Sequence, residues 1–308
     1  MRYAIVSLGV IVAALVGFVA ASCGTGSGAE SAGNVPGNSI RVAGGSSATV
    51  ATETGGKPPS RPAGEDPIQL QVWFHRGEQL FLAVRTFDYY EATPAIGTTA
   101  LQGLFAGPTE EERLEGVQTQ VPDGTELLGL SIDKGIATVN LTSEFESGGG
   151  SASMSMRLAQ VVFTLTQFPN VKGVQFALDG EPIEVLGGEG IVIDQPLTRK
   201  SYAELMPAIV VESPYLGESA GNPLQVSGTA DVYEANVTVI VLDAKGKEIA
   251  RTFTTATCGT GCRGEFSVTI PYKVAEDQQG TVVVQDDDAA GTGHPPHVLE
   301  IPVYLRPA

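Results

Sequence analysis

The sequence is poor in the residues that most often carry chemistry. Its 308 residues include only three histidines, three cysteines and one tryptophan, Trp73. Basic side chains are scarce too, since 18 lysines and arginines stand against 35 aspartates and glutamates, for a formal net charge of −17. So acidic a chain should repel nucleic acid and anionic lipid head groups. These shortages argue against an enzyme and against a nucleic-acid partner, and we expect no cofactor.

The first 23 residues combine an early positive charge, Arg2, with an uncharged apolar run that reaches Ala21. Small residues then precede Cys23, as in the lipobox of bacterial lipoproteins, which this segment resembles. We therefore expect a signal peptide over residues 1–22, cleavage before Cys23 and lipid on its thiol. An uncleaved transmembrane anchor is the alternative, because the run nears the length that spans a membrane. Either way, the rest of the chain should lie outside the cytoplasm, with lipid holding it to the outer face of the cell membrane in the first case.

Residues 23–67 are rich in Gly, Ser, Ala, Thr and Pro and contain almost no large apolar side chains. Such a segment cannot bury a core, so we expect a disordered tether. Its length would let the folded part stand away from the membrane.

Residues 68–203 mix strand and helix patterns. Alternating apolar residues predict one hairpin over Ile68–Phe87 and a second over Leu127–Leu141, with a helix over Pro94–Phe105 between them. A longer helix should precede Pro169, and a strand that turns back through Ile183 and Val185 should follow it. This order predicts an α+β domain in which two helices pack on a mostly antiparallel sheet.

The longer helix is the clearest element of the sequence. Its apolar residues recur at steps of four, three, four and three, which is the period of one helix face: Met154, Leu158, Val161, Leu165 and Phe168. Ser151 or Ser153 should cap its start. Four polar residues lie off this stripe, and we expect Arg157 in particular to be exposed: Arg157, Gln160, Thr164 and Gln167.

From residue 207 onward only strand patterns occur. Seven short runs separated by turn residues predict an immunoglobulin-like β-sandwich over residues 207–306, at 209–212, 224–228, 237–243, 248–255, 265–270, 281–285 and 298–305. The junction before it contains two prolines, so we expect the two domains to fold separately.

Three phrases of the first domain resemble the GerMN domain of sporulation and spore germination proteins. They are LFAGPTEEE, VPDGTELLGLSIDKGIATVNLTSEF and TLTQFPNVKGVQFALDGEPIEVLGGEG. The segment Leu224–Tyr272 resembles the immunoglobulin-like domain that accompanies GerMN in spore germination proteins. The resemblance implies a part in sporulation or germination and a likeness to the ring-building modules of secretion systems. These domains can also serve envelope assembly or signalling in cells that form no spores.

Cys258 and Cys262 form a close pair, CGTGC, between two predicted strands. Outside the cytoplasm such a pair predicts a disulfide that rigidifies the tip of a hairpin. Zinc is the alternative, because His294 and His297 could complete two cysteines and two histidines. Their spacing is tighter than usual for zinc, and the oxidising location favours the disulfide.

Ser219 lies in Gly217–Gly221, which matches the nucleophile elbow G-x-S-x-G. That elbow needs a strand-to-helix turn, whereas Pro223 and another strand follow here. An envelope hydrolase that uses Ser219 is therefore the least favoured of three hypotheses. The leading one is a non-catalytic, lipid-anchored protein that binds envelope proteins or peptidoglycan, and the alternative is an extracytoplasmic sensor that binds a small molecule or glycan.

Overall fold

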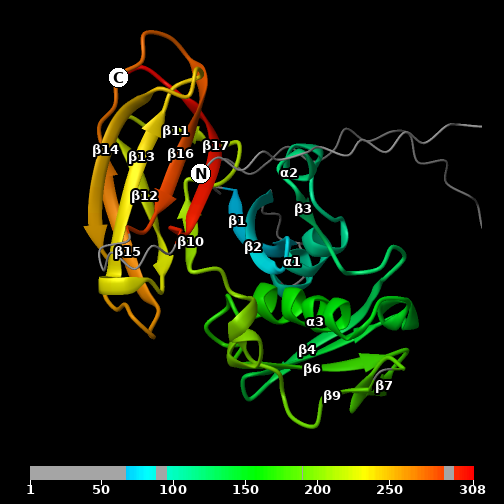
Figure 1. Cartoon of the computed structure of the whole chain (residues 1–308). Helices are drawn as coiled ribbons and strands as arrows, with labels where there is room; N and C mark the ends of the chain where they lie inside the picture. The colour runs from blue at the N-terminus through cyan, green and yellow to red at the C-terminus, as the bar shows by residue number, and fades with distance from the viewer. Residues whose placement is uncertain (1–66, 88–95, 189, 288–294) are drawn as a thin grey trace, which may run out of the picture. The chain divides into compact units, whose positions relative to one another are not determined.

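The computed structural model describes residues 67–87, 96–188, 190–287 and 295–308 (Figure 1). The predicted signal peptide, Cys23, almost all of the predicted tether and His294 lie outside these ranges. No helix in the described residues has both the length and the apolar character needed to cross a membrane.

The α+β domain contains two main sheets rather than one. β1 (Ile68–Arg76) and β2 (Gln79–Phe87) form the predicted first hairpin, and β3 (Val117–Gln118) pairs with the end of β1. The second sheet has the order β4-β5-β6-β7, with bounds Leu127–Asp133, Ile136–Leu141, Gly173–Leu178 and Glu181–Pro182. β8 (Val185–Leu186) and β9 (Ile191–Val192) make a separate small ribbon.

Three α-helices accompany these sheets in the described residues, at Ile96–Phe105 (α1), Glu110–Leu114 (α2) and Ser151–Leu165 (α3). Two segments follow the 3-10 pattern, the short η1 (Ser143–Glu146) and the seven-residue η2 (Arg199–Leu205), which is kinked at Tyr202. The helix α3 joins β5 to β6, which pair in parallel because the crossover brings the chain back to the same end of the sheet. All the other pairs of this domain are antiparallel.

Two local details of α3 differ from the prediction. Gly150 occupies the N-cap position without a side-chain hydrogen bond, so neither Ser151 nor Ser153 caps the helix. The helix ends at Leu165, four residues before Pro169, and Phe168 packs against the core from beyond the helix. The glycines before Ser151 supply the turn without a cap.

A further expectation was wrong in part. The strand after β6 is shorter than predicted. Only Glu181 and Pro182 pair with β6, and the strand ends there because Pro182 cannot donate a hydrogen bond to a ladder. Val185 belongs to the β8–β9 ribbon instead.

The turn between β4 and β5 explains why that hairpin was predictable. Lys134 and Gly135 both have positive φ, at 49° and 87°. Two successive positive φ angles match the twist of the flanking strands, and glycine adopts them without steric cost.

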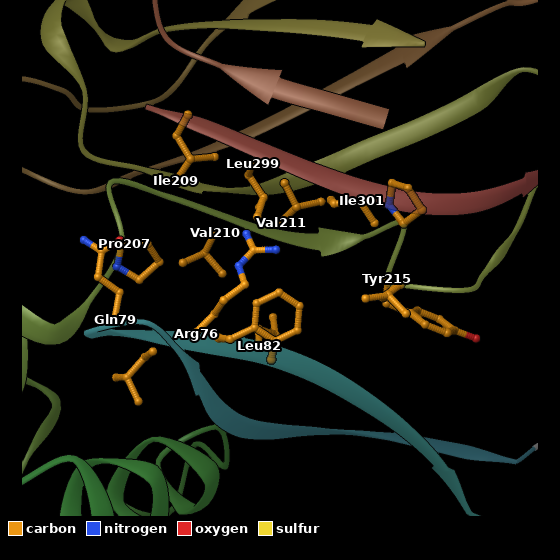
Figure 2. A pocket seen from close by; sticks show the side chains of 14 residues that line it. Arg76, Gln79, Leu82, Pro207, Ile209, Val210, Val211, Tyr215, Leu299 and Ile301 are labelled. Carbon is orange, nitrogen blue, oxygen red and sulfur yellow. The ribbon is translucent and has the colours of Figure 1, made fainter. Parts of the chain in front are cut away.

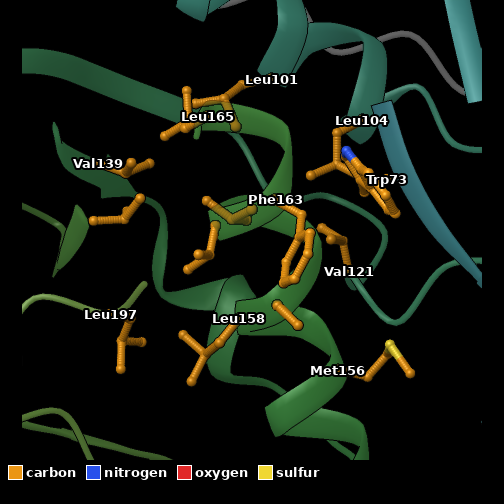
Figure 3. Close-up of a cluster of buried hydrophobic side chains, with 14 of the residues drawn as sticks. Trp73, Leu101, Leu104, Val121, Val139, Met156, Leu158, Phe163, Leu165 and Leu197 are labelled. Atoms are coloured by element: carbon orange, nitrogen blue, oxygen red, sulfur yellow. The ribbon is translucent and has the colours of Figure 1, made fainter. Parts of the chain in front are cut away.

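α3 lies between the two sheets, and the core of the domain surrounds it (Figures 1 and 3). On one side Phe163 packs against Trp73 of β1, with ring centroids 5.1 Å apart. On the other side the cluster continues into β5 and β6 through Val139 and Phe176. A helix in this position must bury more than one face.

The C-terminal domain is the predicted β-sandwich. One sheet has the order β10-β12-β15, at Ile209–Ser213, Leu224–Ala230 and Gly264–Ile270. The other has the order β11-β17-β16-β13-β14, at Ser219–Ala220, Val298–Leu305, Gln278–Gln285, Asn236–Leu242 and Glu248–Thr255. All seven predicted strands are present, and the two-residue β11 is additional. A second apolar cluster fills the space between these sheets.

Candidate functional site

The polar side chains of α3 occupy one edge of β1. β1 pairs with β2 along its whole length, while on its other edge β3 reaches only His75 and Arg76. Gln167 accepts a hydrogen bond from the Gln71 N–H at 2.9 Å and donates one to the Gln71 carbonyl at 2.7 Å. The side chain of Gln167, in the turn just after α3, thus satisfies backbone groups that a neighbouring strand would otherwise pair.

The same arrangement repeats two residues further along β1, at Trp73. The Trp73 N–H donates to Thr164 Oγ1 at 3.1 Å, and the Gln160 side-chain amide donates to the Trp73 carbonyl at 3.1 Å. Gln160 and Thr164 are fully buried. We call Gln160 and Thr164 of α3, together with Gln167 in the turn that follows the helix, the edge-pairing side chains.

Arg157 is buried as well, at 2% exposure, so the prediction that it is exposed was wrong. Its guanidinium donates to three backbone carbonyls, those of Gln120, Phe145 and Gly148. Burial lowers the pKa of Arg157. This side chain ties the loops on either side of β4 and β5 to α3, because each carbonyl belongs to a segment without a strand partner at that point.

The LFAGPTEEE phrase ends in a helix cap and an ion pair. Thr109 and Glu112 form a reciprocal capping box at the start of α2. Arg85 of β2 donates to both carboxylate oxygens of Glu112, at 2.6 and 2.7 Å, and its guanidinium lies over the Phe74 ring. Both partners are largely buried, so this pair fixes α2 on the β1–β2 hairpin. The spacing Thr-x-x-Glu was visible in the sequence and could have predicted the cap.

Cys258 and Cys262 lie in the connection between β14 and β15. The structure pairs them as a disulfide, with Cα atoms 5.7 Å apart. That separation is within the range that a bridge allows. That the two thiols are oxidised stays a prediction.

His297 lies just before β17 and contacts a carboxylate rather than a thiol. Its Nδ1 is 2.8 Å from Asp286 Oδ2, and its backbone N–H donates to Asp286 Oδ1 at 2.6 Å. The described residues contain no group of three or more His, Cys, Asp or Glu side chains placed to hold a metal ion. His294 lies outside the described residues, so the zinc alternative is not decided.

Ser219 lies on the two-residue strand β11, where its hydroxyl accepts a hydrogen bond from Arg306 at 3.1 Å. In the part of the chain that the structure describes, it pairs with Tyr304 of β17, in a parallel pair. A hydrolase elbow opens a helix, and this segment instead leads into β12.

Among the pockets near the junction of the domains, two differ greatly in size. The smaller, of about 60 Å³, is lined mainly by apolar side chains of β2, β10 and β17, and β1 contributes Arg76 (Figure 2). Ligand pockets usually enclose several hundred cubic ångströms, so this one is a gap in packing. The larger is open, encloses about 550 Å³ and has a polar lining: Gln69, Gln71, Thr166, Gln167, Arg199 and Glu212.

Together these features define a class of protein: an α+β domain followed by an immunoglobulin-like sandwich, with buried polar groups that hold the fold together. A family model described as "Sporulation and spore germination" matches residues 76–184. A second, described as "Immunoglobulin-like domain of bacterial spore germination", matches residues 208–292. The chain is therefore a GerMN-type protein with a C-terminal immunoglobulin-like domain, and its domains link it to sporulation or germination.

Similar solved structures include those of the sporulation protein GerM from Bacillus subtilis. Its first GerMN domain is 20% identical, with 43% of this chain and 98% of that chain covered and a TM-score of 0.36. Its tandem GerMN domains are 14% identical, with 79% and 61% covered and a TM-score of 0.38. A presumed lipoprotein from Clostridium perfringens is 23% identical, with 46% and 93% covered and a TM-score of 0.32. No curated protein matches the chain.

Proposed function

We propose that this protein is a non-catalytic, lipid-anchored component of the cell envelope whose folded domains bind envelope proteins or peptidoglycan. The family supports a role in sporulation or germination. The observation that carries the proposal is the use of the buried polar groups. Arg157, Gln160, Thr164 and Glu112 are committed to backbone carbonyls, backbone N–H groups or an ion pair. Groups used in this way are not free to take part in catalysis.

The anchor rests on the sequence around Cys23, where small residues follow an uncharged apolar run. Lipid on this cysteine would place the folded residues outside the cytoplasm, on the outer face of the membrane. Metabolic labelling with a fatty acid tests this directly. We expect the parent protein to be labelled and Cys23→Ala to remain unlabelled, as an uncleaved precursor or a shed form. Equal labelling of both proteins would exclude lipidation at Cys23.

A binding module should present side chains that its own fold does not use. Leu114 of α2 is 77% exposed and Phe253 of β14 is 72% exposed, which makes them the most exposed large apolar side chains among the described residues. Each lies on a different domain. Exposed apolar residues of this kind can contribute to an interface, and single ones are also common on protein surfaces.

The binding test is a pull-down of envelope proteins and peptidoglycan with the 66–308 fragment. We expect retention of at least one envelope component after a salt wash, with weaker retention by Leu114→Ser or Phe253→Ser. Val192→Ser is the matched control, because Val192 is an exposed apolar residue of the small β8–β9 ribbon. Retention of nothing beyond the bare resin would refute the binding role.

A further inference from the structure

The polar pocket beside the C-terminal end of α3 carries one cation and one anion on its walls. The cation is Arg199 of η2 and the anion is Glu212 of β10, and side-chain amides and a hydroxyl complete the lining. Its volume of about 550 Å³ lies in the usual range for pockets that hold small molecules. The pocket is open to solvent, so a ligand could enter without a conformational change.

Arg199 is held rigidly at this site. Its Nε donates to Thr166 Oγ1 at 2.9 Å, and one terminal nitrogen, Nη2, donates to the Phe163 carbonyl at 3.2 Å. The guanidinium also lies over the rings of Phe163 and Trp73, at 4.9 and 5.5 Å from the centroids. Its other terminal nitrogen, Nη1, has no acceptor among the described residues. A fixed guanidinium with a free N–H group loses little entropy when it binds a carboxylate.

Glu212 faces the same pocket without neutralising Arg199 directly. Burial lowers the pKa of Arg199, and the negative charge of Glu212 partly offsets that effect, so the two charges interact. Even so, the structure shows no ion pair between these two residues. Glu212 is exposed, and the Gln71 side-chain amide donates to it at 3.3 Å. The carboxylate therefore keeps most of its acceptor capacity for another donor.

We propose that this pocket binds a small zwitterion of the amino-acid class, with its carboxylate on Arg199 and its ammonium group on Glu212. A simple anion would meet repulsion from Glu212, and a simple cation would meet repulsion from Arg199. Only a ligand that carries both charges satisfies both walls. The side-chain amide of Gln69, which makes no hydrogen bond among the described residues, suits a polar group on that ligand. This inference goes beyond the envelope-binding role and does not depend on it.

Calorimetric titration of the full chain in mild detergent tests the proposal. The probes are glycine, L-glutamine and two analogues of L-glutamine that each lack one charge, N-acetyl-L-glutamine and L-glutaminamide. We expect L-glutamine to bind, and each analogue to bind at least about tenfold more weakly because it loses one charge-assisted contact. No binding of glycine or L-glutamine at about 10 mM, or equal binding of L-glutamine and its analogues, would overturn the proposal.

Variants separate a binding role from a structural one. Glu212→Gln should bind L-glutamine about tenfold more weakly yet bind N-acetyl-L-glutamine more tightly than the parent does, because the repulsion is removed. Glu300→Gln, which changes an exposed carboxylate on β17 outside this pocket, should bind like the parent. Arg199→Gln should abolish ligand binding, but it also removes the contacts of Arg199 with the core. Glu212→Gln is therefore the variant that decides between a binding role and a structural one. If Glu212→Gln lowers the melting temperature and leaves ligand binding unchanged, the two charges serve stability and the proposal fails. The pull-down of envelope components by Glu212→Gln should match the parent, which keeps the two proposals separable.

Discussion

The two domains bury polar groups to different extents. Of the nine buried polar or charged residues among those described, only Thr238 and Asp286 lie in the sandwich. The other seven lie in the α+β domain: His75, Thr99, Glu112, Thr125, Arg157, Gln160 and Thr164. The sandwich satisfies its backbone mostly by pairing strand with strand. The α+β domain places a helix beside an open strand edge, so side chains must form some of the hydrogen bonds that the strand backbone needs.

The largest expected effect comes from the apolar core that surrounds α3. Leu158 and Leu165 are fully buried. Truncating either of them to Ala should cost about 2–5 kcal/mol, through lost transfer free energy and a cavity. Denaturant melts of the full chain measure this cost. A loss below about 0.5 kcal/mol, the range of surface substitutions, would contradict the burial of these residues.

The next effect concerns the buried cation of the same helix. Arg157→Ala should cost about 2–3 kcal/mol, because three carbonyls lose a charged donor in the interior. Arg251→Ala is the matched control, since Arg251 is half exposed and pairs only with Glu248 three residues away. That change should lower the melting temperature much less than Arg157→Ala does, because exposed ion pairs contribute little to stability. If Arg157→Ala and Arg251→Ala have equal melting curves, the hydrogen bonds of Arg157 do not stabilise the fold as described.

The smallest effect belongs to the sandwich. A bridge between Cys258 and Cys262 closes a loop so short that it should contribute less than the roughly 3 kcal/mol expected of a 15-residue loop. We therefore expect the double change to serine to fold, with a modestly lower melting temperature. Intact mass of the untreated protein should be about two hydrogens below that of the reduced form. Two free thiols with one equivalent of zinc would support the metal alternative.

The sequence predicted the sandwich better than the α+β domain. Alternation and turn residues located all seven main strands, because each strand follows a period of two. The short β11 carries no such pattern, and its pairing with Tyr304 and Leu305 of β17 defines it. That the two domains fold separately stays a prediction. Val210 of β10 belongs to the apolar cluster of the first domain, so a test by separate expression is informative.

The error about Arg157 has a physical cause. One apolar stripe predicts one buried face, but α3 lies between two sheets and buries most of its surface. The off-stripe residues themselves recur at steps of three, four and three, from 157 through 160 and 164 to 167. That second helical period, made of polar side chains, was a usable signal of a second packed face. Sequence alone could not show that their partners would be β1 and two loops, since those contacts span up to 96 residues.

The polar pocket was equally hidden from the sequence. Arg199 and Glu212 lie on opposite sides of the sequence junction between the two domains, and neither belongs to a recognisable motif. Their meeting depends on how η2 and β10 are placed beside α3 and β1. By contrast, the cap formed by Thr109 and Glu112 needs only local spacing and could have been predicted.

Amide hydrogen exchange at Trp73 tests the central claim, that side chains of α3 replace a strand partner along β1. We expect the Trp73 amide to be protected in the parent, because it donates to Thr164 Oγ1. In Thr164→Val it should exchange much faster, while the Gln71 amide, held by Gln167, stays protected. A Trp73 amide that exchanges freely in the parent, or that is equally protected in Thr164→Val, would contradict the account.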